Sequence, residues 1–145
     1  MTAPFTGGCR CGAVRFSFPS PPVLTRLCWC RDCQYFAAGN ASVNAVFATA
    51  GATFTGQTRA FETLADSGNR LQRHFCPGCG TPLFSEAAVR PGFRVMRLGT
   101  LDEPGRLRPE MAIWTGSAPG WACHDPGLPG HPDQGPPPAP VRAPA

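Results

Sequence analysis

The chain has 145 residues, of which 42% are hydrophobic, and this argues for one domain with a core of ordinary size. Its 17 glycines, 18 prolines and low charged fraction of 15% favour strands, turns and loops over long helices. The net charge is only +4, and the 13 basic residues, all arginines, are scattered, so we expect no nucleic-acid partner. No apolar run approaches the roughly 18 residues of a membrane span. The first residues lack the features of a signal peptide, so we expect a soluble, cytoplasmic protein without membrane contact.

Short strands are predicted where apolar residues alternate or β-branched and aromatic residues gather. In chain order they are residues 13–18, 43–49, 53–55, 58–64, 70–75, 81–85, 93–101 and 111–114. We expect 53–55 and 58–64 to form a hairpin that turns at Gly56-Gln57, and 34–38 to form a short helical turn. Pro and Gly dominate the end of the chain. The sequence therefore predicts a domain over 1–121 and a disordered tail over 122–145.

Seven of the eight cysteines fall into three tight clusters, which in a reducing compartment predicts metal binding rather than disulfides. The first pair is expected in an extended segment, where side chains at i and i+2 share a face. The last pair brackets Pro77-Gly78, a tight turn whose backbone amides can hydrogen-bond the sulfurs. A structural zinc site takes four ligands. The economical site therefore joins Cys9, Cys11, Cys76 and Cys79, the alternative being free core thiols or two disulfides.

The middle cluster places three thiols within six residues, at Cys28, Cys30 and Cys33. Three ligands leave one position open for water or substrate, which is typical of a catalytic rather than a structural zinc. One alternative is a second structural site that a fourth side chain closes; the candidates are Cys123, His124, His74 and Asp32. Another alternative is thiol redox sensing by a triad that holds no metal.

Some residues beside the cysteines of these clusters have both a functional and a structural interpretation. Arg10 and Arg31 could hold a substrate carboxylate, or they are solvated surface charges. Asp32 could serve as an acid or base, or it caps backbone amides. Trp29 is interpreted as a packing or pocket-wall aromatic.

Four motifs resemble those of a known family. They are Gly8-Cys9-Arg10-Cys11-Gly12-Ala13-Val14, Cys28-x-Cys30-x-x-Cys33, Phe75-Cys76-Pro77-Gly78-Cys79-Gly80-Thr81-Pro82-Leu83-Phe84 and Gly99-Thr100-Leu101-Asp102. In order and spacing, over about residues 7–121, the chain resembles the GFA family of glutathione-dependent formaldehyde-activating enzymes and centromere protein V. The resemblance implies the Mss4-like fold, a mostly β architecture with zinc-binding knuckles and few or no long helices. It also implies two Zn²⁺ per chain: a structural zinc on Cys9, Cys11, Cys76 and Cys79, and a catalytic zinc on Cys28, Cys30 and Cys33.

The resemblance further implies a carbon–sulfur lyase activity, which joins or splits the carbon–sulfur bond of an S-hydroxymethyl thiol adduct. The expected partner is a small thiol substrate such as glutathione or its formaldehyde adduct. Trp29 stands where the family usually has a His, and Ala112 stands where a His often precedes the late aromatic. These departures leave the metal ligands intact and the identity of the thiol open. The alternative is a non-catalytic zinc-binding interaction module, because the same fold includes non-enzymes.

Overall fold

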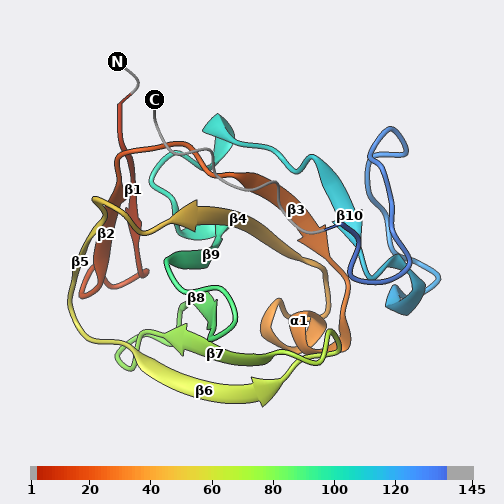
Figure 1. Cartoon of the computed structure of the whole chain (residues 1–145), viewed down its shortest axis with the longest axis horizontal. Helices are drawn as coiled ribbons and strands as arrows, with labels where there is room; N and C mark the ends of the chain where they lie inside the picture. Colours follow the sequence, from red (N-terminus) through yellow and green to blue (C-terminus); the bar gives the residue numbers. More distant parts are fainter. Residues whose placement is uncertain (1–2, 137–145) are drawn as a thin grey trace.

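The computed structural model describes residues 3–136, so residues 1–2 of the expected domain and 137–145 of the expected tail lie outside the described part. Within that range the chain forms ten strands, one α-helix and three short 3-10 helices (Figure 1). The expected mostly β architecture with few or no long helices is confirmed.

The strands are β1 (Phe5–Gly8), β2 (Arg15–Phe18), β3 (Leu24–Cys28), β4 (Ser42–Ala48), β5 (Thr53–Thr55), β6 (Arg59–Leu64), β7 (Arg70–Phe75), β8 (Pro82–Ala87), β9 (Phe93–Arg97) and β10 (Met111–Ile113). The helices are α1 (Arg31–Phe36), η1 (Leu98–Thr100), η2 (Pro104–Arg106) and η3 (Thr115–Ser117). No helix within residues 3–136 is long and apolar enough to cross a bilayer.

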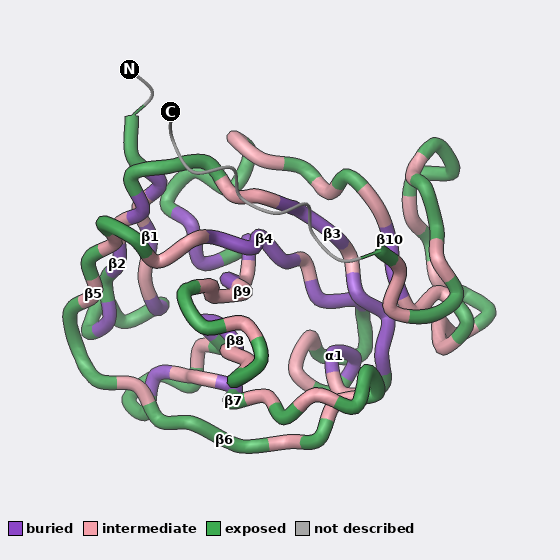
Figure 2. Tube along the Cα trace, in the orientation of Figure 1, coloured by how far each residue is buried: buried purple, intermediate pink, exposed green. Residues whose placement is uncertain are grey.

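The strands form two sheets of unequal size. The small sheet has the order β1-β2-β5, and the large one has the order β10-β3-β4-β9-β8-β7-β6. All neighbours in the large sheet are antiparallel except β10 and β3, which are parallel. The large sheet bends, so that β3 and β4 lie across from β6 and β7 in Figure 1. Central β4 is largely buried and edge strand β6 largely exposed (Figure 2).

The apolar core lies between the two sheets. On one face of the large sheet, Ala45, Met96 and Phe84 stand side by side across β4, β9 and β8. The small sheet covers this face, and its Phe18 ring stacks on Phe47 at 4.3 Å between centroids. Both rings are fully buried, which stabilises the fold by about 1.5–3 kcal/mol for each side chain. Because strand side chains alternate, the residues between these point to the opposite, concave face of the large sheet.

The predicted hairpin between 53–55 and 58–64 is wrong. β5 pairs with β2 in the small sheet, and β6 pairs with β7 at the edge of the large sheet. The reason is packing, because Phe54 on β5 meets Phe18 edge-on at 5.5 Å in the core, whereas β6 is mostly exposed. Gly56 between them has φ +84°, and a Cβ there would lie 2.0 Å from the carbonyl oxygen of Ala13. The chain can therefore cross from one sheet to the other at Gly56 but does not fold back on itself.

The chain after β10 returns along that strand. The backbone N–H of Ala112 donates to the carbonyl of Pro129, and the N–H of His131 donates to the carbonyl of Ala112, both at 2.9 Å. The N–H of Trp114 likewise donates to the carbonyl of Asp133 at 2.8 Å. We call residues 128–135 the C-terminal strap. This part of the expected tail runs against the domain, and the domain boundary at residue 121 stays a prediction.

Candidate metal centres

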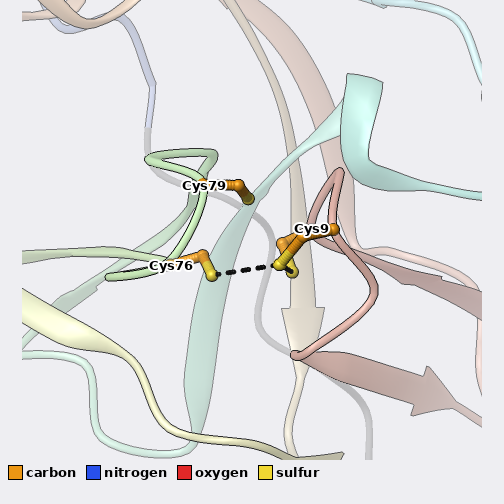
Figure 3. A group of neighbouring side chains, drawn as sticks. Cys9, Cys76 and Cys79 are labelled. Atoms are coloured by element: carbon orange, nitrogen blue, oxygen red, sulfur yellow. Dashed lines mark hydrogen bonds between the residues drawn. The ribbon is translucent and has the colours of Figure 1, made fainter.

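The first candidate metal centre lies where two turns from distant parts of the sequence meet. The Sγ atoms of Cys9, Cys11, Cys76 and Cys79 all lie within 4.8 Å of one another. Cys11 Sγ is 3.5 Å from Cys9 Sγ and 3.8 Å from Cys76 Sγ. Figure 3 shows Cys76 and Cys79 on one turn facing Cys9 on the other. Four sulfurs bound to one zinc at about 2.3 Å would stand roughly 3.8 Å apart. The donor set and its spacing therefore fit a tetrahedral zinc.

Each pair of thiols in this four-thiol cluster is brought together by a turn. The N–H of Gly12 donates to the carbonyl of Cys9 at 3.1 Å, and the N–H of Gly80 donates to that of Cys76 at 2.8 Å. The prediction that Cys9 and Cys11 lie in an extended segment is therefore wrong. The glycine at position 12 has φ +83°, a left-handed conformation that favours glycine.

Hydrogen bonds to the sulfurs of this cluster stabilise the thiolate form of its cysteines. The N–H of Val14 donates to Cys9 Sγ at 3.2 Å, and the N–H of Gly78 donates to Cys76 Sγ at 3.4 Å. Hydrogen bonding from Thr81 lowers the pKa of the Cys79 thiol to about 5. Because a thiolate, not a thiol, binds zinc, these donors favour metal binding.

The second candidate centre is built by one short segment at the junction of β3 and α1. Cys28 is the last residue of β3, Cys30 is the N-cap of α1, and Cys33 lies in its first turn. The backbone N–H of Cys33 donates to Cys30 Sγ at 3.3 Å, so one ligand also caps the helix. All three side chains are buried, and their sulfurs lie within 4.8 Å of one another. We call these residues the three-thiol cluster.

The thiols of this cluster lie so close together that ionisation of one disfavours ionisation of the others. Contacts with Cys28 and Cys30, together with the nearby Arg97 charge and the Ser42 hydroxyl, lower the pKa of the Cys33 thiol to about 2. The contacts with Cys30 and Cys33, with burial, raise the pKa of the Cys28 thiol. Three adjacent sulfurs cannot all be anionic without a neighbouring cation. A divalent metal ion would supply that charge, so the donor set fits zinc here too.

No fourth protein ligand joins the three-thiol cluster among the residues described. His74 is held between Thr58 Oγ1 at 2.7 Å and Glu86 Oε1 at 3.1 Å. Asp32 accepts a hydrogen bond from Arg73 at 3.5 Å, and Cys30, not Asp32, caps the helix. Neither Cys123 nor His124, the remaining candidates, lies with the three thiols.

A cavity of about 100 Å³ opens beside the three-thiol cluster on the concave face of the large sheet. All three cysteines line it, with alternate residues of β3, β4, β7, β8 and β9. Among the described residues that line it, the arginines are Arg26, Arg73, Arg90 and Arg97, and Asp66 is the only acid. The cavity is therefore positively charged, apart from whatever charge the thiols carry.

Two of these arginines lie in one row across the sheet. Arg26 on β3 stands opposite Asn44 on β4, which stands opposite Arg97 on β9. Arg97 Nη1 donates to the side-chain oxygen of Asn44, and Asn44 Nδ2 donates to Ser42 Oγ at 2.7 Å. Ser42 stands opposite Cys28, so this polar network ends at the three thiols.

The sequence analysis missed these arginines and considered Arg10 and Arg31 instead. Both of the latter are exposed and neither lines the cavity. Arg31 donates to Gln34 at 2.6 Å on the surface of α1. The signal that could have found Arg26 is its spacing of two residues from Cys28, which puts both side chains on one face of β3.

The aromatic residues near the cluster divide into core and cavity wall. Trp29 is 1% exposed, packs edge-on against Trp121 at 6.5 Å between centroids and does not line the cavity. Trp114 does line it, from a left-handed backbone conformation with φ 57° that is uncommon outside glycine. Its indole N–H donates to Gln134 Oε1 at 2.8 Å, so the C-terminal strap also contributes to the cavity wall.

These features define a mostly β protein with two cysteine clusters that could hold metal ions. The sequence profile of the glutathione-dependent formaldehyde-activating enzyme family, GFA, matches residues 4–117. The chain belongs to this family, and the resemblance drawn from its motifs is confirmed.

Comparison with solved structures finds the crystal structure of a Rhodobacter sphaeroides protein, with a TM-score of 0.50 and 18% identity. The match covers 67% of this chain and 87% of that one. At this identity the likeness concerns the fold alone. Comparison with curated proteins gives no match.

Proposed function

We propose that the protein is a zinc-dependent enzyme of the carbon–sulfur lyase type that acts on a small thiol adduct. In this proposal Cys9, Cys11, Cys76 and Cys79 hold a structural zinc, and Cys28, Cys30 and Cys33 hold a catalytic one. The observation that carries it is a set of three buried thiols that lines a cavity and has no fourth protein ligand within residues 3–136. Open zinc sites are typical of catalysis and closed ones of structure.

When bound, zinc would supply a soft Lewis acid that can take an incoming substrate sulfur at its fourth position. The reaction splits R–S–CH₂–OH into R–SH and formaldehyde. The carbon–sulfur electron pair goes to sulfur, the hydroxyl O–H pair becomes the second C=O bond, and the hydroxyl proton returns to sulfur. The cysteines would hold the zinc, and with it the reacting sulfur, at one end of the cavity, whose walls limit the access of water.

The test mixes zinc-loaded protein with formaldehyde and, in turn, glutathione and smaller thiols, and follows adduct formation by NMR. We expect two zinc ions per chain and adduct formation above the uncatalysed rate. Cys30→Ser should abolish that acceleration, whereas Cys123→Ser should not change it, because Cys123 belongs to neither cluster. A protein with two zinc ions that neither binds a thiol nor accelerates the reaction would instead be a zinc-binding interaction module. A purified protein without zinc would revive the redox alternative.

A further inference from the structure

The position of one buried cation suggests which thiols this protein accepts. Arg26 is 7% exposed, and it lines the cavity beside the three-thiol cluster. Its Nη1 is shielded from solvent and has no hydrogen-bond partner among the described residues. Burying a charged donor without an acceptor is costly, so such groups normally have an anionic partner. The cavity in front of Arg26 is the place from which that partner would come.

Two other arginines of this cavity already have partners. Arg73 donates to Asp32 at 3.5 Å and to Thr63 Oγ1 at 3.1 Å. Arg97, on the same row as Arg26, donates to Asn44. Of the two buried arginines of the cavity, Arg26 is thus the one with a donor available for a ligand. The charges of Arg97, two strands away, and of half-buried Arg90, which also lines the cavity, add to its attraction for anions.

The spacing of Arg26 and Cys28 along β3 favours a short ligand. Arg26 and Cys28 lie two residues apart on β3, so their Cα atoms are separated by roughly 6.5 Å. A ligand whose sulfur sits at the thiols needs its anionic group only a few bonds away to reach Arg26. The cavity volume of about 100 Å³ also favours a ligand well below drug size, for which pockets measure about 300–1,000 Å³.

We propose that Arg26 binds the carboxylate of a short anionic thiol, whose sulfur is held at the three-thiol cluster. The chemical class is a thiol with its carboxylate one or two carbons from sulfur, as in mercaptoacetate. The sulfur part of this inference rests on the proposed function, and the carboxylate part rests on Arg26. A carboxylate is favoured over a neutral group because it can accept two parallel N–H bonds from a guanidinium.

The test measures binding by calorimetry to the zinc-loaded protein, with constants referred to the thiolate concentration of each probe. The probes are mercaptoacetate, neutral 2-mercaptoethanol, cationic cysteamine and acetate. We expect mercaptoacetate to bind at least ten-fold more tightly than 2-mercaptoethanol, and cysteamine to bind most weakly. This order would show that the cavity prefers an anionic thiol, and the variants below test whether Arg26 is the cause.

Variants then assign the preference to one side chain. In Arg26→Gln and Arg26→Met, mercaptoacetate should lose at least ten-fold in affinity while 2-mercaptoethanol changes less than two-fold. The control is Arg59→Gln, an exposed arginine on edge strand β6 that does not line this cavity and should change neither affinity.

The outcomes separate this inference from the proposed function. If both thiols bind equally to the native protein, the role of Arg26 is overturned and the proposed function stands. If no thiol binds but acetate binds in an Arg26-dependent way, the anion site stands and the proposed function fails. If nothing binds, both are overturned. A loss of zinc from the three-thiol cluster in Arg26→Gln, without a change in anion preference, would mean that Arg26 only neutralises the thiolates.

Discussion

The two cysteine clusters differ in how far along the chain their members lie. The four-thiol cluster joins Cys11 to Cys76 across 65 residues, whereas the three-thiol cluster occupies six consecutive residues. A metal ion in the first cluster would link two turns from distant parts of the chain, which are also joined by a hydrogen bond from the N–H of Arg10 to Thr81 Oγ1 at 3.1 Å. In the second, a strand end and a helix cap already place the sulfurs. We therefore expect a metal ion to stabilise the fold strongly at the first cluster and to contribute little to stability at the second.

The two clusters also differ in what they face. Cys11 and Cys79 are exposed, and the four-thiol cluster does not line the cavity beside the three-thiol cluster. The three-thiol cluster is buried, yet it opens into a cavity with four arginines on its walls. A structural metal site does not need a cavity, whereas a catalytic site needs one to admit its substrate. Each prediction below tests one side of this contrast.

The largest effect is expected at the four-thiol cluster. Cys76→Ser should lower the zinc content from two to one per chain and the thermal midpoint by more than about 15 °C, because metal-binding free energy here is folding free energy. Metal analysis and circular dichroism on heating measure both. Cys123→Ser is the matched control and should behave as the native protein. A Cys76→Ser protein that melts within about 3 °C of native would show that this cluster does not fasten the fold.

A smaller change in stability, with a complete loss of function, is expected at the three-thiol cluster. Cys30→Ser should also lose one zinc, but its thermal midpoint should fall by less than about 5 °C. Serine is a preferred N-cap residue, so its hydroxyl can replace Cys30 Sγ as acceptor for the N–H of Cys33. Thiol affinity, measured by calorimetry, should fall at least 100-fold. If the midpoint fell as far as in Cys76→Ser, the two clusters would not differ in the way proposed.

The C-terminal strap should contribute moderately to thiol binding in the cavity. Deleting residues 128–145 removes the hydrogen bonds along β10 and the Gln134 contact to Trp114. We expect thiol affinity to fall three- to ten-fold, which corresponds to losing about one hydrogen bond of support. Deleting only 137–145 is the control, because it leaves the strap in place. Gln134→Ala measures the contribution of that side chain alone. If thiol affinity is unchanged in both strap variants, the strap has no role in the site.

Local features of the sequence were enough to predict what local chemistry decides. The mostly β architecture followed from short alternating apolar runs, and it is confirmed. The close approach of Cys28, Cys30 and Cys33 is built into a six-residue segment, so spacing alone could indicate it. The family followed from such motifs as well, and it is confirmed.

What the sequence could not predict depends on which strands pair. The row of Arg26, Asn44 and Arg97 exists because β3, β4 and β9 are neighbours in one register, although they lie far apart in the chain. Strand pairing also explains the wrong hairpin. β5 and β6 are close in sequence, but packing of Phe54 in the core places β5 in the small sheet. Residues 128–135 read as a tail because Pro and Gly gave no sign of the hydrogen bonds to β10.

The smallest effect on stability is expected from an ion pair that links the small sheet to the rest of the domain. Asp102 accepts hydrogen bonds from Arg15 Nη1 at 2.9 Å and from Thr6 Oγ1 at 2.7 Å, and thereby ties β1 and β2 to the segment after η1. These contacts, Arg15 first, lower the pKa of the Asp102 carboxyl below its usual value of 3.8. Both side chains are more than 40% exposed, so the pair should contribute only about 0.5 kcal/mol.

Asp102→Asn should therefore lower the thermal midpoint at pH 7 by about 1–2 °C. A lowered pKa in the folded state stabilises the protein above the unfolded-state pKa, and this contribution disappears as the pH falls through the folded-state value. The gap between the midpoints of native and variant protein should accordingly close below about pH 4, where acid acts on the cysteine ligands of both proteins alike. Glu62→Gln, which removes the more exposed pair with Arg70, should give an even smaller gap. A gap that is unchanged in acid would mean that Asp102 acts through its shape and hydrogen bonding to Thr6, and not through its charge.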